Sequence, residues 1–305
     1  MRDTFVHALL AQAQVNRQVV LITGDLGFGV LDAYRTAMPG QFINAGVAEQ
    51  NMTGLAAGMA LEGKTVFTYS IANFPTLRCL EQIRNDVLYH GASVNVVAIG
   101  GGFSYGALGM SHHATEDVAI MRALPGLRVF APCDDQETTA MVAIMVADPA
   151  PTYLRLDKSK VAGSVGAPFE TGRLRRLREG RHLAIVGYGG IVGEALSAAE
   201  ALGEEGIECS VVSAHTLKPF DSDGLLTLAR THDALLTLEE HVGTGGLGSL
   251  TADCFVSAGY LPQRLCRIAL PDAYSAIVGS QEYLRTRHGL DAQAIIAQAR
   301  KLLKH

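Results

Sequence analysis

The sequence contains no tryptophan among its 305 residues, and aromatic residues make up only 6% of it. Its 25 basic residues are outnumbered by 30 acidic ones, so it has no excess positive charge with which to bind a nucleic-acid backbone. No apolar run approaches the ~18 residues of a membrane span, and the first four residues lack the apolar core of a signal peptide. These absences predict a cytoplasmic protein that binds neither nucleic acid nor a membrane.

The cysteines are also few, and none forms a CxxC pair. Five of them are spread along the chain, an odd number without regular spacing. This arrangement is typical of reduced thiols and predicts neither a disulfide framework nor a zinc site. Apolar residues make up 48% of the chain and charged residues 18%, which excludes a disordered protein.

Short β-branched runs alternate with longer helical stretches along the whole chain. Strands are predicted at 19–22, 65–67, 94–99 and 129–130, and a helical stripe of apolar residues at 52–60 lies between two of them. A Gly- and Arg-containing segment at 161–180 fits no long helix, and the alternation restarts after it. The pattern predicts two consecutive α/β domains with mostly parallel sheets, at 1–160 and 181–305, joined by a linker at 161–180.

The most informative segment is 42–63, FINAGVAEQNMTGLAAGMALEG. A strand is expected to end at Asn44 and a helix to begin near Ala48, which places Glu49 in the first helical turn at the carboxyl edge of the sheet. Open α/β sheets bind their ligands at that edge. A lone glutamate there is more often explained by the helix dipole, so the neighbouring sequence has to decide its role.

Residues 46–52 (GVAEQNM), with Gly54 and the Ala-Gly pair at 57–58, resemble the thiamine-diphosphate-binding pyrimidine domain of the transketolase family. Deoxyxylulose-phosphate synthases and the beta subunits of 2-oxo acid dehydrogenases share this domain. The resemblance continues through 69–85, 109–117 and 124–129, and the region after about residue 180 resembles the family's C-terminal domain. Several segments in register make the resemblance more specific than any one motif.

The resemblance implies roles for four residues at the cofactor. Glu49 corresponds to the carboxyl group that hydrogen-bonds the pyrimidine ring and drives it into its imino tautomer. Phe74 corresponds to the aromatic residue that stacks on that ring, and Ile71 stands where transketolases carry a second aromatic residue. Asp25 resembles an acidic loop residue on the cofactor side, and its alternative role is that of a turn residue between glycines.

On the substrate side, His112 corresponds to a histidine near the reacting oxygens, and the adjacent His113 is expected to point elsewhere. Arg155 and Arg2 align with two arginines that hold the substrate phosphate, although Arg2 has the alternative of a solvated terminal charge.

The chain departs from the transketolase pattern at three substrate-reading positions. Gly100 and Leu108 replace a histidine and an aspartate, and Gly29 replaces a serine that helps to bind phosphate. An ordinary pentose-phosphate donor is therefore not expected.

The motif that binds the diphosphate is missing from the sequence. The family holds this group through Mg²⁺ (or Ca²⁺) with a GDG sequence, whereas Leu26 follows Gly24 and Asp25 here. The resemblance therefore implies an N-terminal transketolase-like partner subunit that carries the metal and the diphosphate-binding domain. An α2β2 heterotetramer with a contact between copies of this chain is the expected assembly.

The favoured function is that of the C-terminal subunit of a split transketolase-like enzyme. It would transfer a two-carbon ketol unit from a ketose (phosphate) donor to an aldehyde acceptor. The first alternative is a decarboxylating enzyme that acts on a 2-oxo acid, either deoxyxylulose-phosphate-synthase-like or of the 2-oxo acid dehydrogenase beta type. The second alternative, from another class, is a non-catalytic regulatory subunit. A Gly-rich loop at 239–248 is similar to one in the family's C-terminal domain, and no catalytic role is predicted for it.

Overall fold

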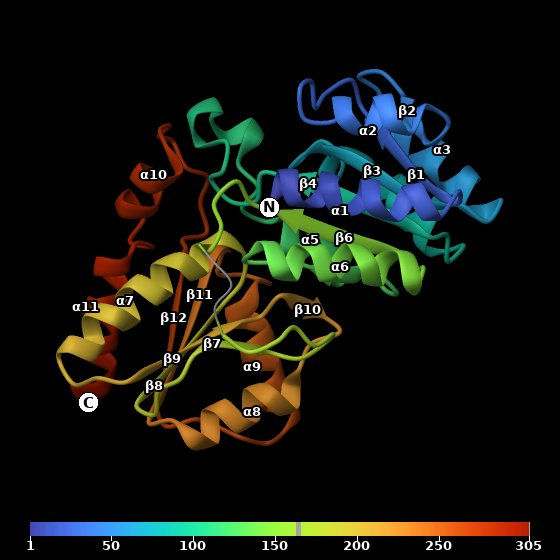
Figure 1. Cartoon of the computed structure of the whole chain (residues 1–305). Helices are drawn as coiled ribbons and strands as arrows, with labels where there is room; N and C mark the ends of the chain where they lie inside the picture. Colours follow the sequence, from blue (N-terminus) through green and yellow to red (C-terminus); the bar gives the residue numbers. More distant parts are fainter. Residues whose placement is uncertain (163–165, 305) are drawn as a thin grey trace.

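Two sheets, each flanked by helices, organise the chain in the computed structural model, which describes residues 1–162 and 166–304 (Figure 1). The first sheet has seven strands in the order β10-β5-β6-β4-β3-β1-β2. All of its pairings are parallel except that of β10 with β5. Its strands are β1 (Val19–Thr23), β2 (Phe42–Asn44), β3 (Thr65–Ile71), β4 (Val94–Ile99), β5 (Arg128–Phe130), β6 (Thr152–Leu156) and β10 (Thr216–Lys218).

Helices cover both faces of this sheet, which is why its central strands are continuous apolar runs. All five residues of β1 are buried, as expected when a parallel strand has cover on each side. Helices α1 and α6 lie side by side over one face (Figure 1), and α3 packs against the other through Met52 and Ala56. The helices of this half are α1 (Arg2–Val15), α2 (Asp32–Ala37), α3 (Glu49–Leu61), α4 (Leu80–Gln82), α5 (Asp117–Ala123) and α6 (Asp135–Ala147).

The second sheet has five strands in the order β12-β11-β8-β9-β7, and only its edge strand β7 is antiparallel to its neighbour. The strands are β7 (Arg175–Arg178), β8 (Leu183–Gly187), β9 (Cys209–Ser213), β11 (Ala234–Val242) and β12 (Leu265–Leu270). The helices are α7 (Val192–Glu204), α8 (Ser222–Thr231), α9 (Leu247–Ser257), α10 (Gln281–Arg287) and α11 (Ala292–Lys304). None of the helices that the structure describes is long and apolar enough to cross a membrane.

Several connections between these elements contain short helices. Five of the 3-10 type lie at Pro39–Gln41, Leu77–Cys79, Gly106–Leu108, Met110–His112 and Gly189–Ile191, and a π-helical stretch lies at Ile83–Leu88. Those after β3 and β4 carry the side chains discussed below.

The predicted fold class, two α/β domains with mostly parallel sheets, is confirmed. Two details differ from the expected division of the chain. Strand β7 lies inside the predicted linker 161–180, of which residues 163–165 fall outside the described residues. Strand β10 follows β9 in sequence and yet joins the edge of the first sheet.

Candidate functional site

The candidate site lies at the carboxyl ends of β1, β2 and β3. These strands are parallel and in register, so Thr23 at the end of β1 lies beside Asn44 on one side and Tyr69 on the other. The loops that follow the three strands therefore emerge at one edge of the sheet. This is the edge at which open α/β folds place ligands.

Glu49 is the first residue of α3, and its side chain is only 3% exposed. The loop after β1 lies against it, since a Cβ added to Gly24 would lie 3.5 Å from Cγ of Glu49. Arg78, from the short helix that follows β3, donates a hydrogen bond from Nη1 to Oε2 of Glu49 over 2.7 Å. A buried carboxylate is thus held at the sheet edge by a charge-assisted contact.

Phe74 and His112 come together at the same edge. The turn after β3 passes through Ala72, whose φ of 35° is in the left-handed region, and closes when Phe74 N donates to Ile71 O. The ring of Phe74 meets the imidazole of His112 edge-on, with 5.2 Å between ring centroids. The guanidinium of Arg78 lies 4.8 Å from the centre of the same Phe74 ring. Ile71, half-buried at the end of β3, packs against the core on the α1 side of the sheet.

His112 ends the 3-10 helix Met110–His112, and its Nδ1 lies 3.0 Å from Oγ of Ser111. Burial, and secondarily the neighbouring His113, lower the pKa of His112. His113 points elsewhere, as expected, because its ring is buried and its Nε2 lies 3.1 Å from the carbonyl oxygen of Gly106.

Asp25 lies at the tip of the loop after β1, exposed and with a φ of 58°. Asn44 braces it, because the Asn44 side chain donates to Oδ1 of Asp25 over 2.8 Å and accepts from the backbone N–H groups of Asp25 and Gly46. Aspartate tolerates this backbone region better than most residues. The loop is therefore fixed in shape, with its carboxylate at the same sheet edge as Glu49.

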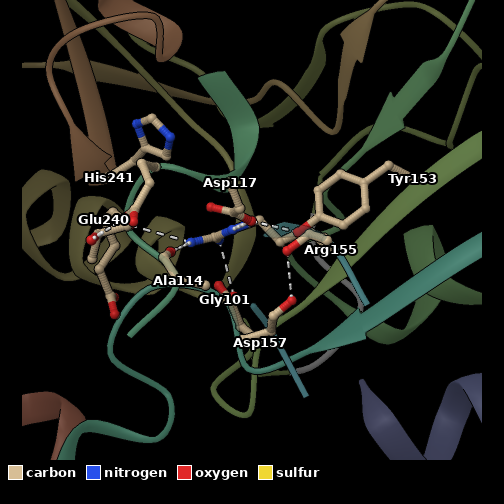
Figure 2. Close-up of polar contacts among 12 residues, drawn as sticks. Gly101, Ala114, Asp117, Tyr153, Arg155, Asp157, Glu240 and His241 are labelled. Carbon is tan, nitrogen blue, oxygen red and sulfur yellow. Dashed lines mark hydrogen bonds and ion pairs between the residues drawn. The ribbon is translucent and has the colours of Figure 1, made fainter. Parts of the chain in front are cut away.

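The position of Arg155 is at odds with the predicted phosphate contact. Its side chain is 1% exposed and forms ion pairs with Asp117 (3.1 Å) and Asp157 (3.0 Å). Figure 2 shows the guanidinium enclosed by these carboxylates, with Tyr153 also donating to Asp117. Its Nη2 donates to the backbone oxygen of Glu240 in the second half of the chain. Arg155 has no exposed face and ties the two halves together instead, which corrects the expectation from the sequence.

Arg2 lies at the start of α1, half-buried, with its Nε donating to Asp3 over 2.9 Å. Its positive charge acts on Lys158 and Tyr105. Burial and the charge of Arg2 together lower the pKa of Lys158, and Arg2 partly offsets the rise in the pKa of Tyr105 that burial causes.

Lys158, which the sequence analysis missed, places a cation beside the candidate site. Its ammonium is 3.7 Å from the centre of the Tyr105 ring, and that ring lies 6.4 Å from the imidazole of His112. Tyr105 also fills the space beside Gly100, since a Cβ added there would collide with Cδ2 of Tyr105. Lys158 follows Arg155 by three residues, and a basic residue just after a strand is the only signal that the sequence offered.

The residues present fit an aromatic nitrogen heterocycle. The face of Phe74 and the carboxylate of Glu49 are already bridged by a planar group that donates hydrogen bonds, the guanidinium of Arg78. A possible metal cluster lies elsewhere among the described residues, where ligand atoms of Cys133, Asp134 and Glu137 lie within 4.8 Å of one another. Both of its carboxylates are paired with buried Arg175, so the cluster is accounted for as an ion-pair network.

Comparison with known proteins agrees with this geometry. The family model of the transketolase pyrimidine-binding domain matches residues 1–163, and that of the transketolase C-terminal domain matches residues 172–295. A 6-deoxy-6-sulfo-D-fructose transketolase subunit from Clostridium sp. (strain MSTE9) is 36% identical, over 99% of this chain and 94% of that relative. An apulose-4-phosphate transketolase subunit from Phocaeicola vulgatus is 32% identical, over 99% of this chain and 97% of that relative.

A solved structure, described as a split-gene transketolase in an inactive beta4 tetramer, superposes with a TM-score of 0.90 and 35% identity. The match covers 99% of this chain and 98% of that one. With both of its halves matched by family models and by relatives over nearly their full length, the chain belongs to the transketolase family.

Proposed function

We propose that this chain is the C-terminal subunit of a thiamine-diphosphate-dependent, transketolase-like enzyme that transfers a two-carbon ketol unit from a ketose donor to an aldehyde. One observation carries the proposal: Glu49, Phe74 and His112 converge at one sheet edge although 63 positions separate the first from the last. A regulatory subunit that had lost catalysis would have no need of all three groups in contact range.

The proposed roles follow from the chemistry of each side chain. When bound, thiamine diphosphate supplies a nucleophilic carbon that can attack a ketone. Glu49 holds a proton at the ring nitrogen (N1′) of the pyrimidine and Phe74 stacks on that ring, while Ile71 supports this edge of the sheet from the core on the α1 side. Asp25 borders the cofactor from the loop after β1.

His112 serves the substrate. Because its pKa is lowered, the imidazole is neutral at physiological pH and has both a donor and an acceptor nitrogen. Ser111 engages Nδ1, so Nε2 is the nitrogen with which His112 contacts the reacting oxygens. Proton transfer by a side chain held in this way contributes typically 10²–10⁴-fold to rates.

The donor proposed is a ketose that carries an anionic group, phosphate or sulfonate, at the end opposite its carbonyl. Lys158 and Arg2 provide two positive charges near Tyr105, whose ring lies 6.4 Å from that of His112. The names of the two relatives above each specify a sugar with such a group. Leu108 and Gly100, which cannot hydrogen-bond sugar hydroxyls through side chains, leave the charged end as the main feature to be recognised.

An N-terminal transketolase-like partner subunit completes the site in this proposal. It holds the diphosphate through Mg²⁺ or Ca²⁺, and two copies of each chain form an α2β2 assembly. The beta4 tetramer of the similar split-gene transketolase is described as inactive, which supports the need for a second type of subunit.

The test begins with co-purification of the partner subunit and continues with a rate measurement on the complex. The wild-type complex should transfer glycolaldehyde from an anionic ketose to an aldehyde when thiamine diphosphate and Mg²⁺ are present. Glu49→Gln should lower kcat by at least about 100-fold, because the amide cannot share a proton with the ring. Glu62→Gln, at the exposed end of the same helix, is the matched control and should retain full activity.

Two results would contradict the proposal. Near-normal activity of Glu49→Gln would remove the central role of that carboxylate. Release of carbon dioxide from pyruvate, without ketol transfer, would favour the decarboxylating alternative instead.

A further inference from the structure

Arg78 makes two contacts that no role described so far explains. Its Nη1 donates to Glu49 over 2.7 Å, and its guanidinium carbon lies 4.8 Å from the centre of the Phe74 ring. The side chain of Arg78 is 47% exposed, whereas that of Glu49 is 3% exposed. Arg78 therefore extends inward from the surface, and its planar guanidinium contacts both the Glu49 carboxylate and the Phe74 ring.

Those two groups are the ones that the proposed function assigns to the pyrimidine ring. A guanidinium is planar and delocalised, stacks on aromatic faces and donates hydrogen bonds in its own plane to carboxylates. A pyrimidine ring with a protonated nitrogen would make the same pair of contacts: the ring would stack on Phe74, and the nitrogen would donate a hydrogen bond to Glu49. Two planar groups cannot occupy one face of Phe74 at the same time.

We propose that Arg78 is a further residue of the pyrimidine site, one that occupies the place of the ring in the unloaded subunit and sets the affinity for thiamine diphosphate by competing with it. The inference rests on the proposed function, because it takes the cofactor-binding roles of Glu49 and Phe74 as given. It goes further in assigning a function to a residue outside those roles.

The pairing has a physical reason in the unloaded chain. A carboxylate that is 3% exposed and unpaired is costly, and Arg78 is the residue that pairs with Glu49 in the described part of the chain. Because half of the Arg78 side chain is in solvent, the guanidinium can leave without disturbing the core. The contact therefore protects Glu49 until a ligand replaces it.

The effect on affinity follows from the populations of the two states. A ligand that binds only the open state has an apparent Kd equal to its intrinsic Kd divided by the open fraction. An ion pair of which one partner is half-exposed, together with a stacking contact, closes the site most of the time but not permanently. If about one molecule in ten is open, removing Arg78 strengthens binding roughly tenfold.

The test is calorimetric titration of thiamine diphosphate, with Mg²⁺ in excess, into the complex of the full chain and its co-purified partner. Arg78→Ala should lower the Kd roughly tenfold and enlarge the rise in melting temperature that the cofactor causes. Arg78→Lys keeps the charge but lacks the planar fork, so its Kd should lie between those of Arg78→Ala and the wild type. Arg84→Ala is the matched control, an exposed arginine of the adjoining π-helical stretch whose Nη1 contacts Asn85.

A second readout follows the guanidinium itself. Phenylglyoxal labels accessible arginines, and peptide mapping should show that Arg78 becomes more reactive when the cofactor is added, while Arg84 does not change. An unchanged or weaker affinity of Arg78→Ala would overturn the inference. If Glu49→Ala loses binding in the same series, the proposed function stands although the inference has failed. Absence of binding by the wild-type complex would overturn both.

Discussion

Replacing Arg155 with methionine tests whether this residue serves substrate or structure. The substitution keeps an apolar stem in place of the first side-chain carbons but removes the guanidinium, which leaves the carboxylates of Asp117 and Asp157 without their cation in a region that is 2% exposed or less. Removing one partner of a buried ion pair costs about 3–5 kcal/mol. Asp117 keeps the hydrogen bond from Tyr153, and Asp157 keeps the hydrogen bond from Gly190 N. The loss of stability should therefore stay within that range, although two carboxylates lose their cation.

For a domain of this size, 1 kcal/mol corresponds to about 2–4 °C, so the melting temperature should fall by roughly 10 °C. Thermal unfolding followed by circular dichroism measures the change. The double variant Arg155→Met/Asp117→Asn should recover part of the loss, because one of the unpaired charges is then gone. A melting temperature within about 2 °C of wild type, together with a raised KM for an anionic donor, would refute the structural role and restore the original expectation of a phosphate contact.

Three other perturbations have defined outcomes. Lys158→Met should leave the melting temperature unchanged, because the side chain is exposed, and raise the KM for an anionic donor about tenfold while kcat stays the same. Gly102→Ala should lower both the free energy of unfolding and kcat/KM, because the φ of Gly102 is 58° and the added Cβ would collide with Oε1 of Glu240. Gly91→Ala is the control: its φ is similar, 62°, but the added Cβ meets no described atom within 4 Å, so kcat/KM should be retained. Burial raises the pKa of Glu239 to about 7 from its ordinary 4.5, so the folded state binds the Glu239 proton more tightly than the unfolded state does. The free energy of unfolding therefore gains about 3 kcal/mol as the pH falls from 7 to 4.5. The stability advantage of the wild type over Glu239→Gln, measured from melting at pH 5 and pH 8, should therefore be larger at pH 5; an equal difference at both values would contradict this.

The parts of the site that the sequence predicted correctly depend on local patterns. A strand followed by a Gly-containing turn and a helix placed Glu49 at the sheet edge, and the structure has it in the first turn of α3. His113, next to the histidine matched to the family's, was expected to point elsewhere, and the two rings do have different partners. Whether the named residues bind cofactor and substrate remains a prediction.

The parts that the sequence did not predict depend on long-range contacts. Arg155 is enclosed by Asp117 and Glu240, which lie 38 and 85 positions away, and no periodicity shows which cation of a basic segment will turn inward. Lys158, three residues later, is exposed, and its ammonium lies against the ring of Tyr105. Arg78 belongs to a helix too short to show a helical periodicity in the sequence, so its pairing with Glu49 could not be predicted from the sequence.

Strand β10 has a consequence for attempts to divide the protein. It leaves the second half of the chain and closes the edge of the first sheet beside β5, where Lys218 Nζ also donates to the backbone oxygen of Arg122 over 2.9 Å. A truncated fragment that stops before residue 180 would present β5 as an open, unpaired border, the kind of surface along which chains aggregate. A single proteolytic cut in the segment between the sheets, by contrast, should leave two pieces that remain associated and copurify.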